Sequence, residues 1–164
     1  MLHTIMLGVL YLFPLSEVLL ALQKRAHSSG ARSEDGGSVL MLWVVFGAAI
    51  AAAVYTSNSS IVLLPLSRSV RELFAVLAMG SGILLRWSAI HTLGRFFTVD
   101  VAIHPEQTVV QNGLYRWVRH PSYTGLLLIF LGMGLFFGNF LSLLVLFVPA
   151  SFALWARRVC LAIT

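Results

Sequence analysis

The chain has 164 residues, of which 59% are hydrophobic and 10% charged, and its formal net charge is +5. Soluble globular domains carry about 25% charged residues, so this composition excludes a soluble enzyme or binding module and predicts an integral membrane protein. Nucleic acid is not an expected partner, because the cations are scattered beside apolar segments instead of gathered with aromatic residues on one soluble face.

Apolar segments follow one another along the chain, and a helix needs roughly 20 residues to span hydrocarbon. They run from Leu2 to Leu22, Val39 to Tyr55, Val70 to Ile90, Leu126 to Phe137 and Phe140 to Ala156. The first lacks the basic start of a signal peptide, so we expect a retained helix. Only Gly138 and Asn139 separate the last two, which favours a tight hairpin. The sequence therefore predicts an all-α, polytopic bundle of about five transmembrane helices, forming a single membrane domain over residues 1–164.

The Lys and Arg residues predict the orientation of this bundle, because positively charged loops stay in the cytoplasm. With five spans, Arg68 and Arg71 alone lie on one side. The other cations share the opposite side: Lys24, Arg25, Arg32, Arg86, Arg95, Arg116, Arg119, Arg157 and Arg158. We therefore expect an N-terminus outside and a cytoplasmic loop from Thr92 to Ser122. The expected location is the bacterial inner membrane, or the endoplasmic reticulum membrane in a eukaryote.

Isolated polar and small residues within the apolar segments have structural interpretations. Glu17 would cost roughly 2.5–3.5 kcal/mol at the bilayer centre unless it faces the bundle, so we expect a buried polar contact rather than catalysis. Four glycines are predicted to mark close helix contacts, namely Gly80, Gly82, Gly132 and Gly134. We expect no metal site, because Cys160 is the single cysteine and neither His91 nor His104 has a second ligand at a recognisable spacing.

Polar chemistry is concentrated in the run from Gly113 to Gly125, directly before the fourth apolar segment. His120-Pro121 predicts a helix start, and the positive end of that helix beside Arg119 suits a carboxylate or a phosphate. The alternative is an ordinary arginine and histidine at the membrane interface. Three aromatic residues either form an interfacial belt or stack on a flat base or a cation: Tyr115, Trp117 and Tyr123.

Upstream of this run, two motifs complete a pattern: Thr108-Val109-Val110 and Gly94-x-Phe96-Phe97-Thr98. Together with Gly113-x-Tyr115 and Arg119-His120-Pro121-Ser122-Tyr123-x-Gly125, they resemble the isoprenylcysteine carboxyl methyltransferase family of membrane enzymes. The likeness continues more weakly from Asp35-Gly36-Gly37-Ser38 to about Arg158. It implies a cytoplasmic pocket for S-adenosylmethionine, with residues 92–125 carrying the family motif.

The resemblance implies transfer of a methyl group from S-adenosylmethionine to the carboxylate of a prenylated or other lipidic substrate, with membrane lipid as the surrounding partner. It assigns the cofactor to Gln107, Thr108, Val109, Val110, Tyr115, His120, Pro121, Ser122 and Tyr123. It also gives Arg158 a catalytic role, as the partner of the substrate carboxylate. No catalytic base is expected, because an α-carboxyl with a pKa near 3.3–3.7 is already ionised at neutral pH.

The end of the sequence departs from the family pattern, in which an arginine is followed about one turn later by paired glutamates and a further tail. Ala162 stands where the first glutamate is expected and the sequence ends at Thr164, so we expect a C-terminally incomplete member with weak or no activity. Three alternatives stay open: a phospholipid or amine methyltransferase, a non-catalytic pseudoenzyme, and a sterol-reductase-like enzyme using a nicotinamide cofactor.

Overall fold

A computed structural model describes residues 4, 8, 13–19, 38–58, 63–94, 113–118 and 120–163, with the backbone alone at 38, 39 and 157–163. Its long helices are α2 (Ser38–Ser57), α3 (Arg68–Leu93), α4 (Pro121–Phe137) and α5 (Phe140–Ile163). A 3-10 turn, η2 (Gly113–Arg116), precedes α4, and residues 13–19 are also helical. Within these ranges the backbone is helix and loop, with a lone bridge between Leu63 and Asn139. The predicted all-α bundle is confirmed.

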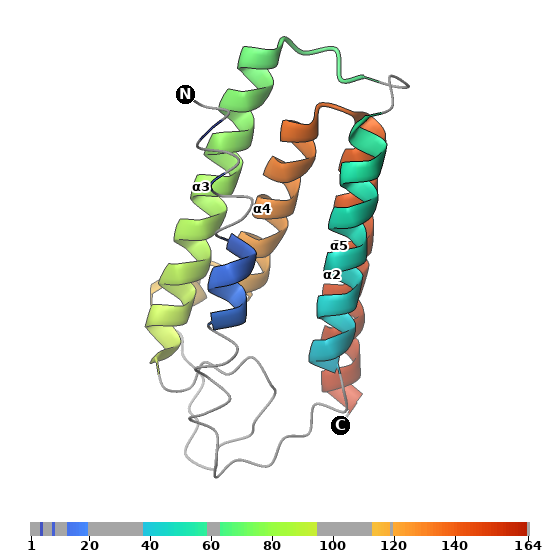
Figure 1. The fold of residues 1–164 in the computed structure, drawn as a ribbon. Helices are drawn as coiled ribbons and strands as arrows, with labels where there is room; N and C mark the ends of the chain where they lie inside the picture. The colour runs from blue at the N-terminus through green and yellow to red at the C-terminus, as the bar shows by residue number, and fades with distance from the viewer. Residues whose placement is uncertain are drawn as a thin grey trace.

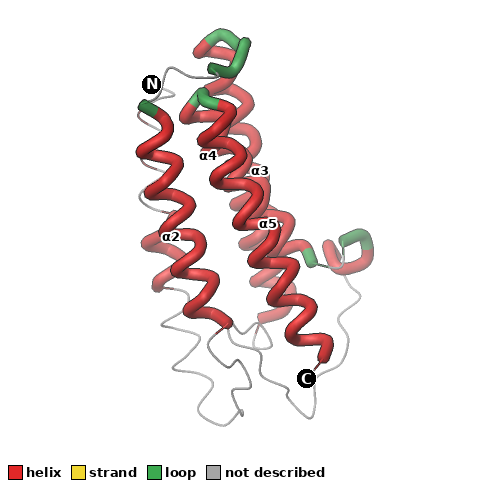
Figure 2. Tube along the Cα trace, turned by 90° about the vertical axis from the view of Figure 1, so that its right-hand side faces the viewer, coloured by secondary structure: helices red, strands yellow, loops and turns green. Residues whose placement is uncertain are grey.

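The four long helices run up and down beside one another (Figures 1 and 2). α3 packs mainly on α4, while α5 packs on both α2 and α4. At the lower end in Figure 1 lie the end of α3, the start of α4, the start of α2 and the end of α5. We call this the motif end, because α4 begins there at Pro121. The opposite, hairpin end carries the turn between α4 and α5 at Gly138 and Asn139.

Within the described part of the chain, two helices are long and apolar enough to cross a membrane, over Leu40–Ser57 and Arg68–Leu93. Their outward faces are apolar and exposed, as a lipid-facing surface must be, for example at Leu40, Val44 and Leu84. α4 is shorter, with 17 residues. The expected five spans stay a prediction, because much of the first apolar segment and all of residues 20–37 lie outside the described ranges.

Glycines allow α3 and α4 to touch through their backbones. A Cβ added at Gly82 would lie 2.6 Å from the carbonyl oxygen of Gly125, and one at Gly125 would lie 2.6 Å from the carbonyl oxygen of Gly82. Gly132 meets α3 at Ala75 and Met79, and Gly134 meets Leu143 of α5. The predicted contacts at Gly82, Gly132 and Gly134 are therefore confirmed.

The prediction for Gly80 was wrong, since a Cβ there would have no neighbour within 4 Å. Gly80 lies on α3 only two residues from Gly82, but the helix turns about 100° per residue and carries it off the contact face. Gly125 is a contact that the sequence analysis missed, because it was considered only as part of the motif.

The hairpin between α4 and α5 is confirmed and is closed by polar contacts. Gly138 ends α4 in the left-handed conformation, with φ of 73°. The fully buried Asn139 accepts a hydrogen bond from the backbone N–H of Leu141 at 2.8 Å and donates to the carbonyl of Thr56 at 3.2 Å. Arg71 of α3 donates to the carbonyl of Gly138 at 2.9 Å. This network ties α2, α3 and the hairpin together and fixes the register of the bundle.

Candidate functional site

α4 begins as His120-Pro121 predicts. His120 is the N-cap residue, and its carbonyl accepts hydrogen bonds from the backbone N–H groups of Tyr123 and Thr124 at 3.1 and 3.0 Å. Because residues three apart share one face of a helix, this first turn also brings two side chains together. The rings of His120 and Tyr123 stack with centroids 5.8 Å apart and planes inclined by 21°. His120 is exposed and Tyr123 half-buried, so the stacked rings lie at the boundary between the bundle and its surroundings.

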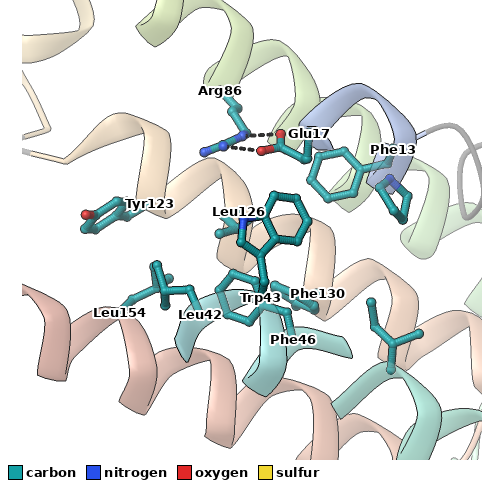
Figure 3. A pocket seen from close by; sticks show the side chains of 12 residues that line it. Phe13, Glu17, Leu42, Trp43, Phe46, Arg86, Tyr123, Leu126, Phe130 and Leu154 are labelled. Atoms are coloured by element: carbon teal, nitrogen blue, oxygen red, sulfur yellow. Dashed lines mark hydrogen bonds and ion pairs between the residues drawn. The ribbon is translucent and has the colours of Figure 1, made fainter. Parts of the chain in front are cut away.

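Behind this turn lies a largely buried ion pair between Arg86 of α3 and Glu17 of the 13–19 segment (Figure 3). Arg86 of α3 is only 8% exposed, and its Nε donates to Glu17 Oε1 at 2.6 Å while its Nη2 donates to Glu17 Oε2. Its Nη1 donates to the hydroxyl oxygen of Ser122 at 2.7 Å and, at 3.4 Å, to the Ser122 carbonyl. The expected buried contact of Glu17 is confirmed, and its partner is an arginine.

An apolar cavity of about 100 Å³ opens beside the ion pair. It is bounded by the 13–19 segment and by all four long helices (Figure 3), and its wall is rich in aromatic rings. The lining residues are mainly Phe13, Trp43, Phe46, Leu126 and Phe130, with Arg86, Glu17 and Tyr123 supplying its polar edge. The lining of the cavity is mostly apolar, and its polar edge lies against the first turn of α4 at Tyr123.

The turn before α4 rests on the end of α3. Gly113 has a positive φ of 61° and passes close to Thr92. The Tyr115 hydroxyl lies 3.5 Å from the carbonyl of Ala89, and burial raises the pKa of this phenol above its ordinary value of 10.0. Tyr115 therefore stays a neutral hydrogen-bond donor at physiological pH. Trp117 is 83% exposed, with the Arg116 guanidinium 5.8 Å from its ring centroid, and fits the interfacial-belt interpretation.

The structure brings five of the predicted cofactor residues to the motif end. Tyr115 contacts α3 at Ala89, one turn beyond Arg86, and the others form the first turn of α4: His120, Pro121, Ser122 and Tyr123. Ser122 differs from its neighbours, since it is buried and its hydroxyl oxygen accepts a hydrogen bond from Arg86. The predicted positions from Gln107 to Val110 lie outside the described residues, and at Arg158 only the helical backbone is described.

Arg86 is the site residue that sequence reasoning missed. It was counted as one of the loop cations that set the topology, although it lies within the apolar segment from Val70 to Ile90. An ionisable residue inside such a segment calls for a partner, and Glu17 in the first apolar segment carries the opposite charge. These two unusual charges were the signal that could have identified the pair.

Comparisons with known proteins point to one family. The model of the isoprenylcysteine carboxyl methyltransferase (ICMT) family matches residues 74–160, more than half of the chain, and that stretch contains Arg86 and the start of α4. Protein-S-isoprenylcysteine O-methyltransferase of Schizosaccharomyces pombe is 38% identical over 73 residues, which cover 43% of this chain and 29% of that protein. Protein-S-isoprenylcysteine O-methyltransferase A of Arabidopsis thaliana is 34% identical over 88 residues, covering 52% of this chain and 44% of that protein.

The matches thus span less than half the length of either relative, and no solved structure matches the chain. The family match and the two relatives nevertheless agree on one family, and the apolar helices agree with its membrane character. The chain is a membrane protein that belongs to the isoprenylcysteine carboxyl methyltransferase family.

Proposed function

We propose that this protein is a methyltransferase that transfers a methyl group from S-adenosylmethionine to the carboxylate of a prenylated or other lipidic substrate. The observation that carries the proposal is the cavity beside the first turn of α4, which is lined mostly by apolar and aromatic residues and has a polar edge formed by Arg86, Glu17 and Tyr123. A lipidic substrate with an apolar tail and a charged reacting group needs an apolar site and a polar site next to each other. The names of the two relatives support an isoprenylcysteine substrate.

The described residues fit S-adenosylmethionine in their chemistry. The stacked rings of His120 and Tyr123 offer aromatic faces, which attract a cation within about 6 Å of a ring centroid. The N-terminus of α4 carries positive partial charge, which favours the carboxylate of the cofactor. We assign the cofactor site to Tyr115, His120, Pro121 and Tyr123. The family resemblance adds Gln107, Thr108, Val109 and Val110. Once bound, the cofactor supplies an electrophilic methyl group on a sulfonium.

The protein's own task in this reaction is positioning. The substrate carboxylate is ionised at neutral pH, so no side chain has to remove a proton from it. The cavity buries the apolar tail, which stabilises binding by about 25 cal/mol per Å² of apolar surface. Holding the two reactants in line can supply roughly 7–11 kcal/mol of the barrier reduction. We keep the proposed pairing of Arg158 with the carboxylate, since an arginine can bind a carboxylate in bidentate fashion.

Radiolabelled S-adenosylmethionine and N-acetyl-S-farnesylcysteine test the proposal on the purified protein in lipid vesicles. Label should pass to the farnesylcysteine in a form that mild base releases, because a methyl ester is base-labile. Base-stable label on membrane lipid would support the phospholipid or amine methyltransferase instead. Failure of the parent to bind S-adenosylhomocysteine at millimolar concentration would defeat the proposal, and binding without transfer to any acceptor would identify a pseudoenzyme.

Variants of the first turn of α4 test the assignment of the site. His120→Ala and Tyr123→Ala should each weaken S-adenosylhomocysteine binding about tenfold, which corresponds to about 1.4 kcal/mol. Trp117→Ala is the matched control, because this ring lies in the same connection but is 83% exposed. If all three variants bind S-adenosylhomocysteine as the parent does, the ring pair does not hold the cofactor.

A further inference from the structure

We propose that Arg86 is a positioning residue for this site: clamped by Glu17, its guanidinium holds Ser122 and thereby sets the stacked His120 and Tyr123 rings. This inference rests on the proposed function for its consequence in catalysis. The control of the His120 and Tyr123 rings by Arg86 is inferred from described contacts and can be tested without measuring catalysis.

The guanidinium of Arg86 is divided between two partners. Nε and Nη2 face the carboxylate of Glu17, and Nη1 faces the hydroxyl and carbonyl oxygens of Ser122. Arginine can do this because its planar fork presents donors in fixed directions, whereas a lysine ammonium is a single point of charge. Each nitrogen of Arg86 already donates to a protein oxygen, so Arg86 acts on the site through Ser122.

Ser122 is the residue through which Arg86 would control the positions of the His120 and Tyr123 rings. It lies between the two stacked residues in sequence, with His120 two positions before it and Tyr123 directly after it. Because Arg86 donates hydrogen bonds to both the hydroxyl and the carbonyl oxygen of Ser122, it limits rotation of the first turn of α4. A turn fixed in this way keeps the His120 and Tyr123 side chains on the face where they stack.

The backbone contact below this turn makes a second point of attachment. A Cβ at Gly125 would lie 2.9 Å from the backbone nitrogen of Arg86, so the start of α4 is seated directly on α3 at this residue. The close contact at Gly125 fixes the separation of α3 and α4. The Arg86 guanidinium fixes the rotation of the first turn of α4 through Ser122. Glu17 then holds the guanidinium itself, from a segment that also lines the cavity through Phe13 and Pro14.

The decisive variant is Arg86→Lys, which keeps a positive charge opposite Glu17 but lacks the planar fork that binds both Glu17 oxygens and Ser122 in fixed directions. We expect it to weaken S-adenosylhomocysteine binding at least tenfold and to lower kcat, while the KM for N-acetyl-S-farnesylcysteine changes less than threefold. Ser122→Ala, which keeps the ion pair intact, should weaken the same binding by about threefold. Arg71→Lys is the matched control, because Arg71 lies on the same helix but binds the carbonyl of Gly138 at the hairpin end.

A second readout does not depend on methyl transfer. In protein labelled with 13C-histidine, the His120 resonance should move in Arg86→Lys toward its position in Tyr123→Leu, where the neighbouring ring is absent. Arg71→Lys should leave it unmoved. If Arg86→Lys lowers the melting temperature as Arg71→Lys does, yet leaves both the His120 resonance and cofactor affinity unchanged, the role of Arg86 is structural and the inference fails.

The two readouts also separate this inference from the proposed function. A parent protein that binds no S-adenosylhomocysteine would defeat the methyltransferase proposal, while the His120 resonance would still decide whether Arg86 sets the ring pair. A parent that transfers methyl groups, combined with an unmoved resonance and unchanged affinity in Arg86→Lys, would defeat the inference alone.

Discussion

At the scale of single residues, the contact between Gly82 and Gly125 leaves no room for a side chain. Gly125→Ala places a methyl group 2.6 Å from the Gly82 carbonyl oxygen and 2.9 Å from the Arg86 backbone nitrogen, and these backbone atoms cannot move aside as the end of a flexible side chain can. We expect it to lower the free energy of unfolding by about 1–3 kcal/mol, the usual cost of overpacking. Gly80→Ala is the control, since nothing lies within 4 Å and alanine favours a helix. Denaturation of both variants in detergent checks this, and equal stability would contradict the close contact.

Predictions at the residue scale were confirmed where they depend only on a residue and its neighbours in the sequence. Proline at the first helical position and the need of Glu17 for a polar partner are properties of one residue and its neighbours in the chain. The sequence shows the two opposite charges in apolar segments but not their contact, because residues 17 and 86 meet only once the 13–19 segment lies against α3. The failed prediction at Gly80 has the same cause, since the contact face of α3 depends on which side α4 covers.

At the scale of elements, the hairpin between α4 and α5 depends on Asn139. Its side chain is fully buried and satisfies both the first turn of α5 and the end of α2. Asn139→Ala should therefore lower the free energy of unfolding by about 1–2 kcal/mol, the usual loss for a helix cap. Because the hairpin end lies opposite the site, affinity for S-adenosylhomocysteine should stay within twofold of the parent (Figure 1).

Asn58→Ala is the matched control, because Asn58 is exposed at the same end of the bundle. It should leave both stability and affinity unchanged, as judged by thermal unfolding and titration calorimetry. A large loss of cofactor affinity in Asn139→Ala with no loss of stability would show that the two ends are coupled more directly than the packing indicates.

The lengths of the elements were predictable only where apolar runs define them. The apolar run before the hairpin begins at Leu126, yet α4 begins five residues earlier at Pro121. Ser122 can lie in this buried turn because Arg86 satisfies its hydroxyl, and Thr124 bonds the His120 carbonyl. Hydrophobicity alone therefore placed the end of α4 correctly and missed its first turn, which the His120-Pro121 signal predicted. The cavity was not predicted, since five separate segments form its wall.

At the scale of the whole molecule, the Lys and Arg residues are distributed unequally between the two ends of the bundle. At the hairpin end, Arg68 pairs with Glu72 at 2.8 Å and Arg71 binds the carbonyl of Gly138, so both positive charges take part in local contacts. In the sequence, most of the Lys and Arg residues precede the start of α2, stand between α3 and α4, or fall near the end of α5, and these helix ends lie at the motif end. This asymmetry favours a cytoplasmic motif end, because cytoplasmic loops are the positively charged ones. An intracellular cofactor would then reach the stacked rings directly.

Cysteine labelling tests this orientation in a Cys160→Ser background. Ser67→Cys and Trp117→Cys place single exposed thiols at the hairpin end and near the motif end respectively. A membrane-impermeant maleimide added to intact cells should label Ser67→Cys at once and Trp117→Cys only after permeabilisation. The reverse pattern would put the site outside the cell, where no intracellular S-adenosylmethionine could reach it. Labelling of both from one side would mean that the four helices do not traverse the bilayer as an up-and-down bundle.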